Sequence, residues 1–183
     1  MGQKNILRHR VPEIRRGTEA KNNDPYFLRK GLKEPAKCST CQSVYHHKKW
    51  YSKDNPIAWK LRNKPMELTV CAACRKTGEH YPAGVVTLRG EFLKNHRDEI
   101  FNLIRNEEAR AKGVDPLERL ISMRDRGNFI EVQTTGEKLA QRIGKDIQRA
   151  FKGEVSYHWT GGDKFVRVEW QRGGEAELKK QPA

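Results

Sequence analysis

The sequence lacks any long apolar run. No stretch approaches the roughly 20 apolar residues that a transmembrane helix needs. Residues 1–17 carry charge but not the apolar segment of a secretory signal. The chain begins Met-Gly, yet Ile6 stands where a myristoylation motif requires Ser or Thr. These absences predict a cytoplasmic protein with no membrane partner.

Acidic and apolar residues are both scarce. The 183 residues include 23 Asp and Glu against 37 Lys and Arg, which gives a net charge of +14. A protein with this field attracts polyanions, and nucleic acid is the commonest polyanionic partner. Only 36% of the residues are apolar and 33% are charged, so the core must be small for the length. This composition favours two compact units with exposed segments over one large enzyme-like domain.

No cysteine is left outside a motif, because all four lie in two Cys-x-x-Cys pairs, Cys38/Cys41 and Cys71/Cys74. In a chain without an export signal this pattern indicates metal binding in a reducing compartment, not disulfides. Each pair places two thiolates on one side of a knuckle turn, and two knuckles supply the four soft ligands of tetrahedral zinc. The 29 residues between the pairs, 42–70, predict a zinc ribbon with a projecting loop.

Two other interpretations of the cysteines fit less well. A thioredoxin-like redox site needs a Cys-x-x-Cys that opens a helix within a βαβ unit, and neither pair follows a hydrophobic strand and opens an amphipathic helix. A catalytic zinc needs an open coordination position beside a general base. His46, His47 and His80 stand near the knuckles, but four thiolates already fill the shell. The sequence therefore predicts one structural Zn²⁺, which holds together a segment too polar to fold alone.

Cations are interleaved with flat aromatic side chains between the two knuckles, and Asp54 is the only acid there before Glu67. Such a mixture suits phosphate neutralisation together with stacking on unpaired bases. For Trp50 and Trp59, packing on the knuckles as a minimal core is an equal alternative at each position. The nucleic-acid-binding residues predicted in this loop are Lys48, Lys49, Trp50, Tyr51, Lys53, Trp59, Lys60, Arg62 and Lys64.

Residues 85–172 show regular hydrophobic periodicity and predict an α+β domain. Its expected strands are 84–90, 128–135, 154–159 and 164–170, and its expected helices are 91–113, 115–124 and 136–152. This β-α-α-β-α-β-β order predicts helices packed on one face of a mainly antiparallel sheet. A hairpin turn is expected at 160–163. His96 falls on the apolar stripe of the first helix, and we interpret it as a core histidine, not a metal ligand.

The helix expected at 136–152 is amphipathic and basic. Thr134 and Glu137 predict a capping box at its start. Opposite its apolar side runs a stripe of like charges, which repel by about 0.2–0.5 kcal/mol per neighbouring pair. A solvated face normally mixes signs, so the stripe favours phosphate contact over the alternative of an indifferent surface. Its members are Lys138, Arg142, Lys145, Arg149 and Lys152.

The two ends differ from the rest of the chain. Residues 1–33 are basic and without clear periodicity, which predicts an arm that orders against phosphates. Residues 173–183 are expected to form a polar tail. The predicted organisation is therefore an arm at 1–33, a zinc ribbon at 34–84, an α+β domain at 85–172 and a tail at 173–183.

Two segments resemble the NMD-three family, the zinc-ribbon adaptors for nuclear export of the large ribosomal subunit and their archaeal relatives. VCAACRKTGEHYPAGVVTLRG, residues 70–90, is similar to that family's second knuckle, its Tyr-containing turn and its strand ending in Leu-Arg, here Leu88-Arg89. FIEVQTTGEKLAQRIGKDIQRAFKGEV, residues 129–155, resembles its strand, its amphipathic helix ending at Phe-x-Gly and its return strand. The similarity runs patchily over residues 37–170, and the family usually carries more knuckles and further domains.

The resemblance implies a small prokaryotic relative that binds ribosomal RNA of the large subunit, in ribosome assembly, hibernation or quality control. Nuclear export does not carry over. The alternative of a zinc-ribbon DNA-binding transcriptional regulator requires a recognition helix with base-reading Arg, Asn or Gln, and no segment shows one. A nuclease or zinc hydrolase requires acids or a His-Glu pair at metal-binding spacing. The acids here are dispersed, so neither an enzyme nor a small-molecule substrate is predicted.

Overall fold

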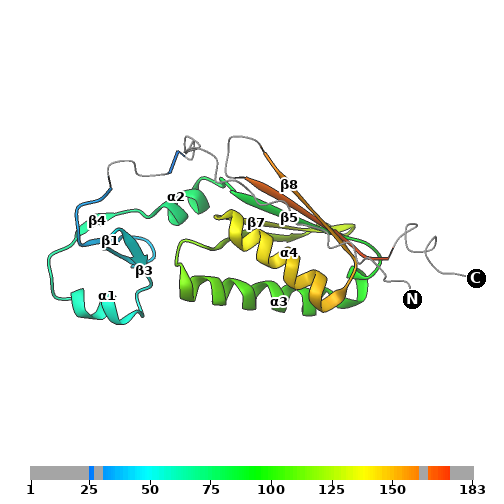
Figure 1. Cartoon of the computed structure of the whole chain (residues 1–183), viewed down its shortest axis with the longest axis horizontal. Helices are drawn as coiled ribbons and strands as arrows, with labels where there is room; N and C mark the ends of the chain where they lie inside the picture. Colours follow the sequence, from blue (N-terminus) through cyan, green and yellow to red (C-terminus); the bar gives the residue numbers. More distant parts are fainter. Residues whose placement is uncertain (1–24, 27–30, 161–164, 174–183) are drawn as a thin grey trace, which may run out of the picture.

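The computed structural model describes residues 25–26, 31–160 and 165–173. They form a small N-terminal unit, residues 31–83, beside a larger C-terminal unit, residues 84–173 (Figure 1). The elements of the first unit are β1 (Ala36–Cys38), β2 (Val44–His46), β3 (Lys49–Tyr51), α1 (Pro56–Leu61), β4 (Glu67–Thr69) and α2 (Ala72–Gly78). Those of the second are β5 (Gly84–Arg89), α3 (Leu93–Val114), β6 (Leu120–Asp125), β7 (Phe129–Thr134), α4 (Glu137–Phe151), β8 (Glu154–Trp159) and β9 (Val166–Gln171).

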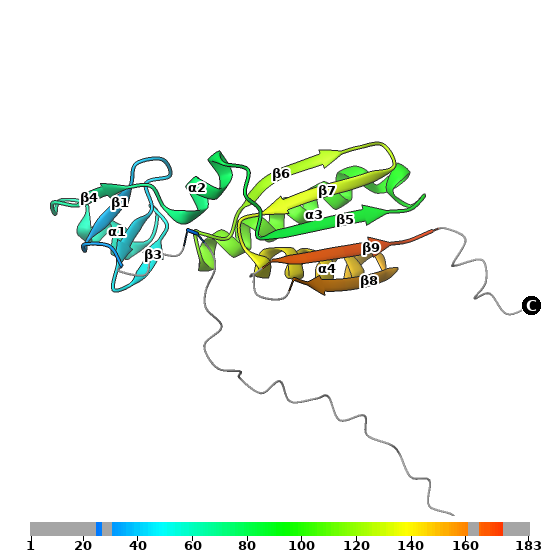
Figure 2. The same ribbon diagram turned by 90° about the horizontal axis from the view of Figure 1, so that it is seen from above.

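The C-terminal unit is a five-stranded sheet with α3 and α4 on one face (Figure 2). The strand order is β6-β7-β5-β9-β8, in which β5 and β9 are parallel and the other neighbours antiparallel. Burial alternates along β5 and β9, so every second side chain points toward the helices. The core contains Val86, Leu88, Ile100, Ile104, Ile130, Val132, Leu139, Ile143, Ile147, Val166, Val168 and Trp170. The predicted α+β class is confirmed.

The helix predicted at 115–124 is wrong. Asp115 accepts a hydrogen bond from the Leu117 amide at 2.9 Å and forms a turn, after which the chain continues as β6. β6 pairs antiparallel with β7 and contributes Leu120 and Met123 to the core. A short apolar run fits either a helix or a strand, and the open edge of β7 decides in favour of the strand. The observed order is therefore β-α-β-β-α-β-β.

The capping box predicted at the start of α4 is also wrong. The Thr134 hydroxyl donates to the Gly136 carbonyl at 2.7 Å, and the helix begins without a hydrogen bond from its own N-cap side chain. The carboxylate of Glu118 instead accepts from the Leu139 amide at 3.0 Å. Burial raises the pKa of Glu118, although this backbone hydrogen bond acts against the rise. The cap of α4 thus comes from the turn that precedes β6.

His96 is not fully buried in the core, contrary to the prediction. It is half-buried at a kink in α3, where its backbone leaves the helical region with φ −126°. Its ring stacks on Phe92 with centroids 3.9 Å apart, and its Nδ1 lies 3.2 Å from a carboxylate oxygen of Glu99. The contacts with Phe92 and Glu99 account for the half-buried position of His96 at the kink.

The N-terminal unit has little apolar material. Its sheet has the order β3-β2-β1-β4, with three residues in each strand. Val44, Ala58 and Leu61 form one small buried cluster. A second cluster consists of Trp50 and Ala73 with two of the cysteines. Clusters of this size cannot offset the entropy of ordering about 50 residues, because that cost is about 1–2 kcal/mol per residue.

Parts of the predicted organisation lie outside the described residues. These are most of the arm at 1–33, most of the hairpin turn at 160–163 and nearly all of the tail at 173–183. Within the described ranges, no helix is long and apolar enough to cross a bilayer.

Two glycines test the packing of α4 on the sheet. A Cβ on Gly144 in α4 would lie 2.5 Å from Val168 Cγ1, whereas a Cβ on Gly113 in α3 meets no atom within 4 Å. Overpacking costs about 1–3 kcal/mol, and replacing a helical glycine returns about 1 kcal/mol. We expect Gly144→Ala to lower the free energy of unfolding and Gly113→Ala to raise it slightly, as measured by chemical denaturation. Equal stabilisation of both variants would contradict this packing.

Candidate metal centre and nucleic-acid interface

Four cysteine sulfurs meet at one point of the N-terminal unit. Cys38 ends β1, Cys41 lies in the following turn, and Cys71 and Cys74 stand at the start of α2. All four Sγ atoms lie within 4.8 Å of one another. The Sγ–Sγ distances are 3.8 Å for Cys38–Cys74 and 3.7 Å for Cys41–Cys71. Metal–sulfur bonds of about 2.3 Å give a tetrahedron with edges of about 3.8 Å. The predicted ligands therefore fit one metal ion.

Backbone amides also point at the sulfurs. The amides of Cys41 and Cys71 donate to Cys38 Sγ at 3.5 and 3.4 Å, and the Cys74 amide donates to Cys71 Sγ at 3.5 Å. The first turn passes through Gln42, whose φ of 65° brings the chain back sharply. These donors stabilise thiolates, so the knuckles are shaped for anionic sulfur.

Contacts among the sulfurs and burial shift the pKa values of Cys41, Cys71 and Cys74 in different directions. A hydrogen bond from the Cys71 thiol lowers the pKa of Cys41 to about 3, and hydrogen bonds from Arg119 and Ser43 act in the same direction against burial. The hydrogen bond to Cys41 and burial raise the pKa of Cys71, and burial raises the pKa of Cys74. Because metal ligands must be thiolates, binding of a divalent ion releases the remaining protons.

The second Cys-x-x-Cys opens a helix, which the sequence analysis did not expect. The Cys71 side chain caps α2 by accepting from the Cys74 amide. The redox alternative still lacks its βαβ unit, because β4 and β5 on either side of α2 belong to different sheets. Among the described residues, only the cysteines form a group able to hold a metal, so His46, His47 and His80 do not join it.

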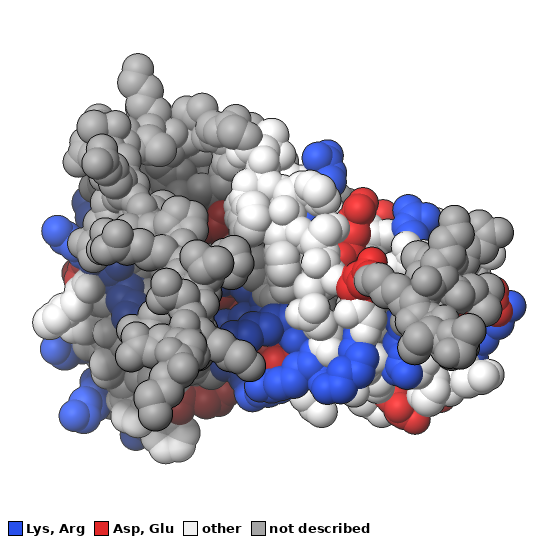
Figure 3. Space-filling model, turned by 45° about the vertical axis from the view of Figure 1, so that its right-hand side comes forward, with Lys and Arg blue, Asp and Glu red and all other residues white. Residues whose placement is uncertain are grey.

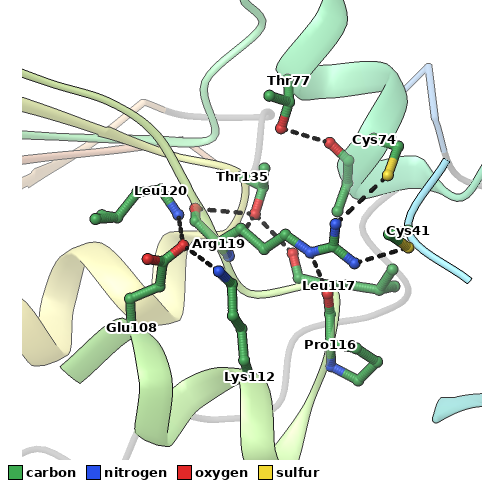
Figure 4. Close-up of polar contacts among 11 residues, drawn as sticks. Cys41, Cys74, Thr77, Glu108, Lys112, Pro116, Leu117, Arg119, Leu120 and Thr135 are labelled. Carbon is green, nitrogen blue, oxygen red and sulfur yellow. Dashed lines mark hydrogen bonds and ion pairs between the residues drawn. The ribbon is translucent and has the colours of Figure 1, made fainter. Parts of the chain in front are cut away.

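Arg119, which the sequence analysis missed, reaches the cysteines from the C-terminal unit (Figure 4). Its Nη2 donates to Cys41 Sγ at 3.0 Å and its Nη1 donates to Cys74 Sγ at 3.4 Å. Burial alone would lower the pKa of Arg119, but the hydrogen bond to Cys41 and the sulfur charges raise it above its ordinary value. Arg119 therefore keeps its positive charge beside the sulfurs.

The two tryptophans of the basic loop have opposite environments. Trp50 is only 8% exposed and packs with Cys38, Cys71 and Ala73, which favours the alternative of a core residue at this position. Trp59 is 62% exposed on α1, because Ala58 and Leu61 occupy the buried side of that helix. Only Trp59 can therefore offer a free indole face to a partner from this loop.

Trp59 borders a groove with a volume of about 240 Å³, which we call the Trp59 groove. Its lining includes four cations and no acid. The lining residues are Lys37, Gln42, Val44, Lys53, Ala58, Trp59, Arg62, Lys64 and Met66. Lys53, Trp59, Arg62 and Lys64 were predicted from the sequence, and Lys37 was not. The fold of the N-terminal unit thus gathers cations around one exposed aromatic ring.

The other residues predicted in this loop lie elsewhere. Lys49 stands over the ring of Tyr51 at 5.7 Å on the β2–β3 hairpin, and Lys60 is exposed on α1. The hairpin turn has positive φ at His47 and Lys48, as a type I′ turn requires. The Glu34 carboxylate holds the turn by accepting from both amides, at 2.6 and 2.9 Å.

Lys48 also borders a cavity of about 460 Å³ between the two units. Its charged lining is mixed, with three lysines and three acids. The charged residues are Lys48, Lys76, Lys138, Asp115, Glu118 and Glu137. A cavity with balanced charge lacks the one-signed character that would select a polyanion.

All five members of the basic stripe on α4 are exposed, but acids lie among them. Arg149 pairs with Asp146 at 2.9 Å, and Arg142 lies 3.9 Å from Glu107 of α3. Burial, followed by a hydrogen bond with Asp146, raises the pKa of Glu107. On the face shown in Figure 3, Lys and Arg patches likewise adjoin smaller Asp and Glu patches. The stripe is thus less uniform in sign than the sequence pattern indicates.

Comparison with known proteins adds no relative. No protein-family model, curated protein or solved structure matches this chain. The resemblance to the NMD-three family therefore stays a prediction from sequence motifs.

Metal removal should act selectively on the N-terminal unit. Its apolar clusters are small, so we expect a strong chelator to abolish amide protection over residues 36–51. Protection over residues 139–147 of α4, which lie in the larger core, should remain. Hydrogen exchange followed by mass spectrometry measures both segments in one sample, and restoring the metal should restore protection. Unchanged protection over 36–51 after verified metal loss would contradict the prediction.

Proposed function

We propose that this chain is a cytoplasmic, zinc-binding protein that binds ribosomal RNA of the large subunit, as a ribosome assembly, hibernation or quality-control factor. The Trp59 groove carries the proposal, since it combines four cations, no acid and an exposed indole. The cations would neutralise phosphates, and the indole would stack on an unpaired base. A partner that offers both groups is single-stranded or looped RNA.

Zinc is the metal proposed for the four thiolates. Soft sulfur donors in a tetrahedral arrangement favour zinc among the common divalent ions, and a set of four cysteines is typical of structural sites. The two knuckles would then form a zinc-ribbon-like element. Because four thiolates complete the shell, no coordination position is left for a substrate, which favours a binding role over an enzymatic one.

The alternative of a duplex-DNA-binding regulator has weaker support. Duplex readout places an exposed helix in the major groove with side chains that contact base edges. The helices of the N-terminal unit, α1 and α2, have six and seven residues, and the exposed indole of Trp59 has no base to stack on in an intact duplex. Affinity for ribosomal RNA and for duplex DNA at the same salt concentration separates the two functions.

Substitution of Trp59 tests the RNA-binding proposal directly. Base stacking contributes about 1–3 kcal/mol, so Trp59→Ala should weaken binding to a ribosomal RNA fragment by about 5- to 150-fold. Trp59→Phe should retain much of the affinity. Trp159, which is 60% exposed on β8, offers the matched control Trp159→Ala, and we expect this variant to bind normally. Fluorescence anisotropy measures each dissociation constant. An equal loss of RNA affinity in the two alanine variants, or tighter binding to duplex DNA than to RNA, would contradict the proposal.

Sedimentation of native lysate through a sucrose gradient tests the ribosomal partner. We expect the protein to travel with large subunits or intact ribosomes at low salt and to be released as salt rises. The double variant Lys145→Ala/Arg149→Ala should be released at lower salt, since fewer phosphate contacts oppose dissociation. Identical release of the variant and the wild type would remove α4 from the interface. Wild-type protein at the top of the gradient in low salt would exclude a stable ribosomal complex.

A further inference from the structure

We propose that Arg119 is an outer-shell residue of the metal centre, through which the loaded centre fixes the C-terminal unit against the N-terminal unit. This proposal rests on the zinc proposed above at the four thiolates. Arg119 contacts one sulfur from each Cys-x-x-Cys motif, Cys41 from the first and Cys74 from the second. A planar guanidinium presents its N–H groups in a fixed fork, so it can bridge two acceptors that a point charge cannot bridge.

Charge explains why an arginine belongs at this position. A divalent ion with four thiolates carries an excess of about two negative charges, and partial burial of that excess is costly without donors. Cys38 receives two backbone amides and Cys71 receives one. The charged nitrogen donors found on Cys41 and Cys74, within the described residues, come from Arg119. Ser43 also hydrogen-bonds to Cys41, so what Arg119 adds to Cys41 and Cys74 is a positive charge.

The guanidinium is held from the C-terminal unit. Its Nε donates to the Pro116 carbonyl at 2.6 Å. The backbone of Arg119 exchanges two hydrogen bonds with Thr135, one to the Thr135 hydroxyl at 2.8 Å and one from the Thr135 amide at 2.9 Å. Thr135 lies between β7 and the start of α4. The contacts therefore run from the sulfurs through Arg119 to Thr135, in the connection that precedes α4 (Figure 4).

A second contact joins Thr135 to the N-terminal unit. Lys76 on α2, the helix that begins at the second cysteine pair, donates through Nζ to the Thr135 carbonyl at 3.3 Å. Leu117, two residues before Arg119, packs against the cluster that contains Cys38 and Trp50. The junction between the units is thus built around the metal centre, and its order depends on the sulfurs remaining in place.

Metal binding and the Arg119 contacts must stabilise each other, because coupling between two equilibria is reciprocal. Loss of the metal removes the ion that holds the four sulfurs in place and lowers the negative charge that Arg119 faces, so the junction loosens. Loss of Arg119 removes the positive charge that compensates the negative charge on the sulfurs, and retention of the metal becomes weaker. A residue that only joined the two units would affect stability, and it would leave the electronic properties of the sulfurs unchanged.

The test compares Arg119→Ala and Arg119→Lys with the matched control Arg126→Ala in the full chain, since Arg126 is exposed on the β6–β7 turn. Outer-shell substitutions typically cost about 10- to 100-fold in metal affinity. We expect Arg119→Ala to lose zinc to a chromophoric chelator with an affinity reduced by this factor. Arg119→Lys should be intermediate, and Arg126→Ala should match the wild type.

Substitution of cobalt for the metal distinguishes an outer-shell role of Arg119 from a role that only joins the two units. Removal of N–H donors raises electron density on sulfur, so the sulfur-to-cobalt charge-transfer band of Arg119→Ala should shift to lower energy. If Arg119→Ala does not fold, the band of Arg119→Lys decides instead. Hydrogen exchange over residues 117–120 and 134–138 should rise in the wild type when zinc is removed.

The possible results distinguish the role of Arg119 from the zinc assignment and from RNA binding. A wild-type chain that contains no zinc overturns both the zinc assignment and the role of Arg119. One zinc per chain, with retention and the cobalt band unchanged in the Arg119 variants, overturns the role of Arg119 alone. RNA affinity is not a readout here, so failure of RNA binding leaves this result intact.

Discussion

Four sulfur atoms held within 4.8 Å of one another are the constraint on which the N-terminal unit depends. Thiolates so close together repel unless a cation lies between them, and the surrounding amides are placed for thiolates. The rest of the unit offers three-residue strands and two small apolar clusters. A metal ion bound by the four sulfurs would supply the free energy that burial of apolar surface cannot. The position of the Trp59 groove follows from the same centre, since β1 and the turn after it provide both ligands and groove lining.

Both charged side chains and apolar contact join the two units. Arg119 extends the electrostatics of the metal centre into the C-terminal unit, and Glu118 beside it caps α4. Arg119 and Glu118 are adjacent in one short turn, yet Arg119 contacts the cysteine sulfurs and Glu118 contacts the start of α4. These contacts connect the unit that carries the Trp59 groove to the unit that carries the basic stripe of α4. The proposed binding of a folded RNA by both surfaces would depend on this connection.

Local patterns account for what the sequence predicted well. The Cys-x-x-Cys spacing determines the ligand geometry within each turn, and alternation within six residues identifies β5, β7, β8 and β9. Contacts between distant residues account for what it missed. Arg119 and Cys41 are 78 positions apart, and the Glu118 cap of α4 spans 21 positions. Trp50 and Trp59 lie in the same basic, aromatic segment of the sequence, so the pattern cannot distinguish them. In the structure Trp50 is buried, whereas Ala58 and Leu61 occupy the buried side of α1 and leave Trp59 exposed.

X-ray absorption at the zinc K edge of the purified chain is the decisive test of the four-sulfur centre, because it reports the identity and distance of the atoms bound to the metal. The account predicts four sulfur neighbours at about 2.3 Å and no lighter ligand. A shell that includes nitrogen or oxygen at about 2.0–2.1 Å, or no zinc signal at all, would contradict it.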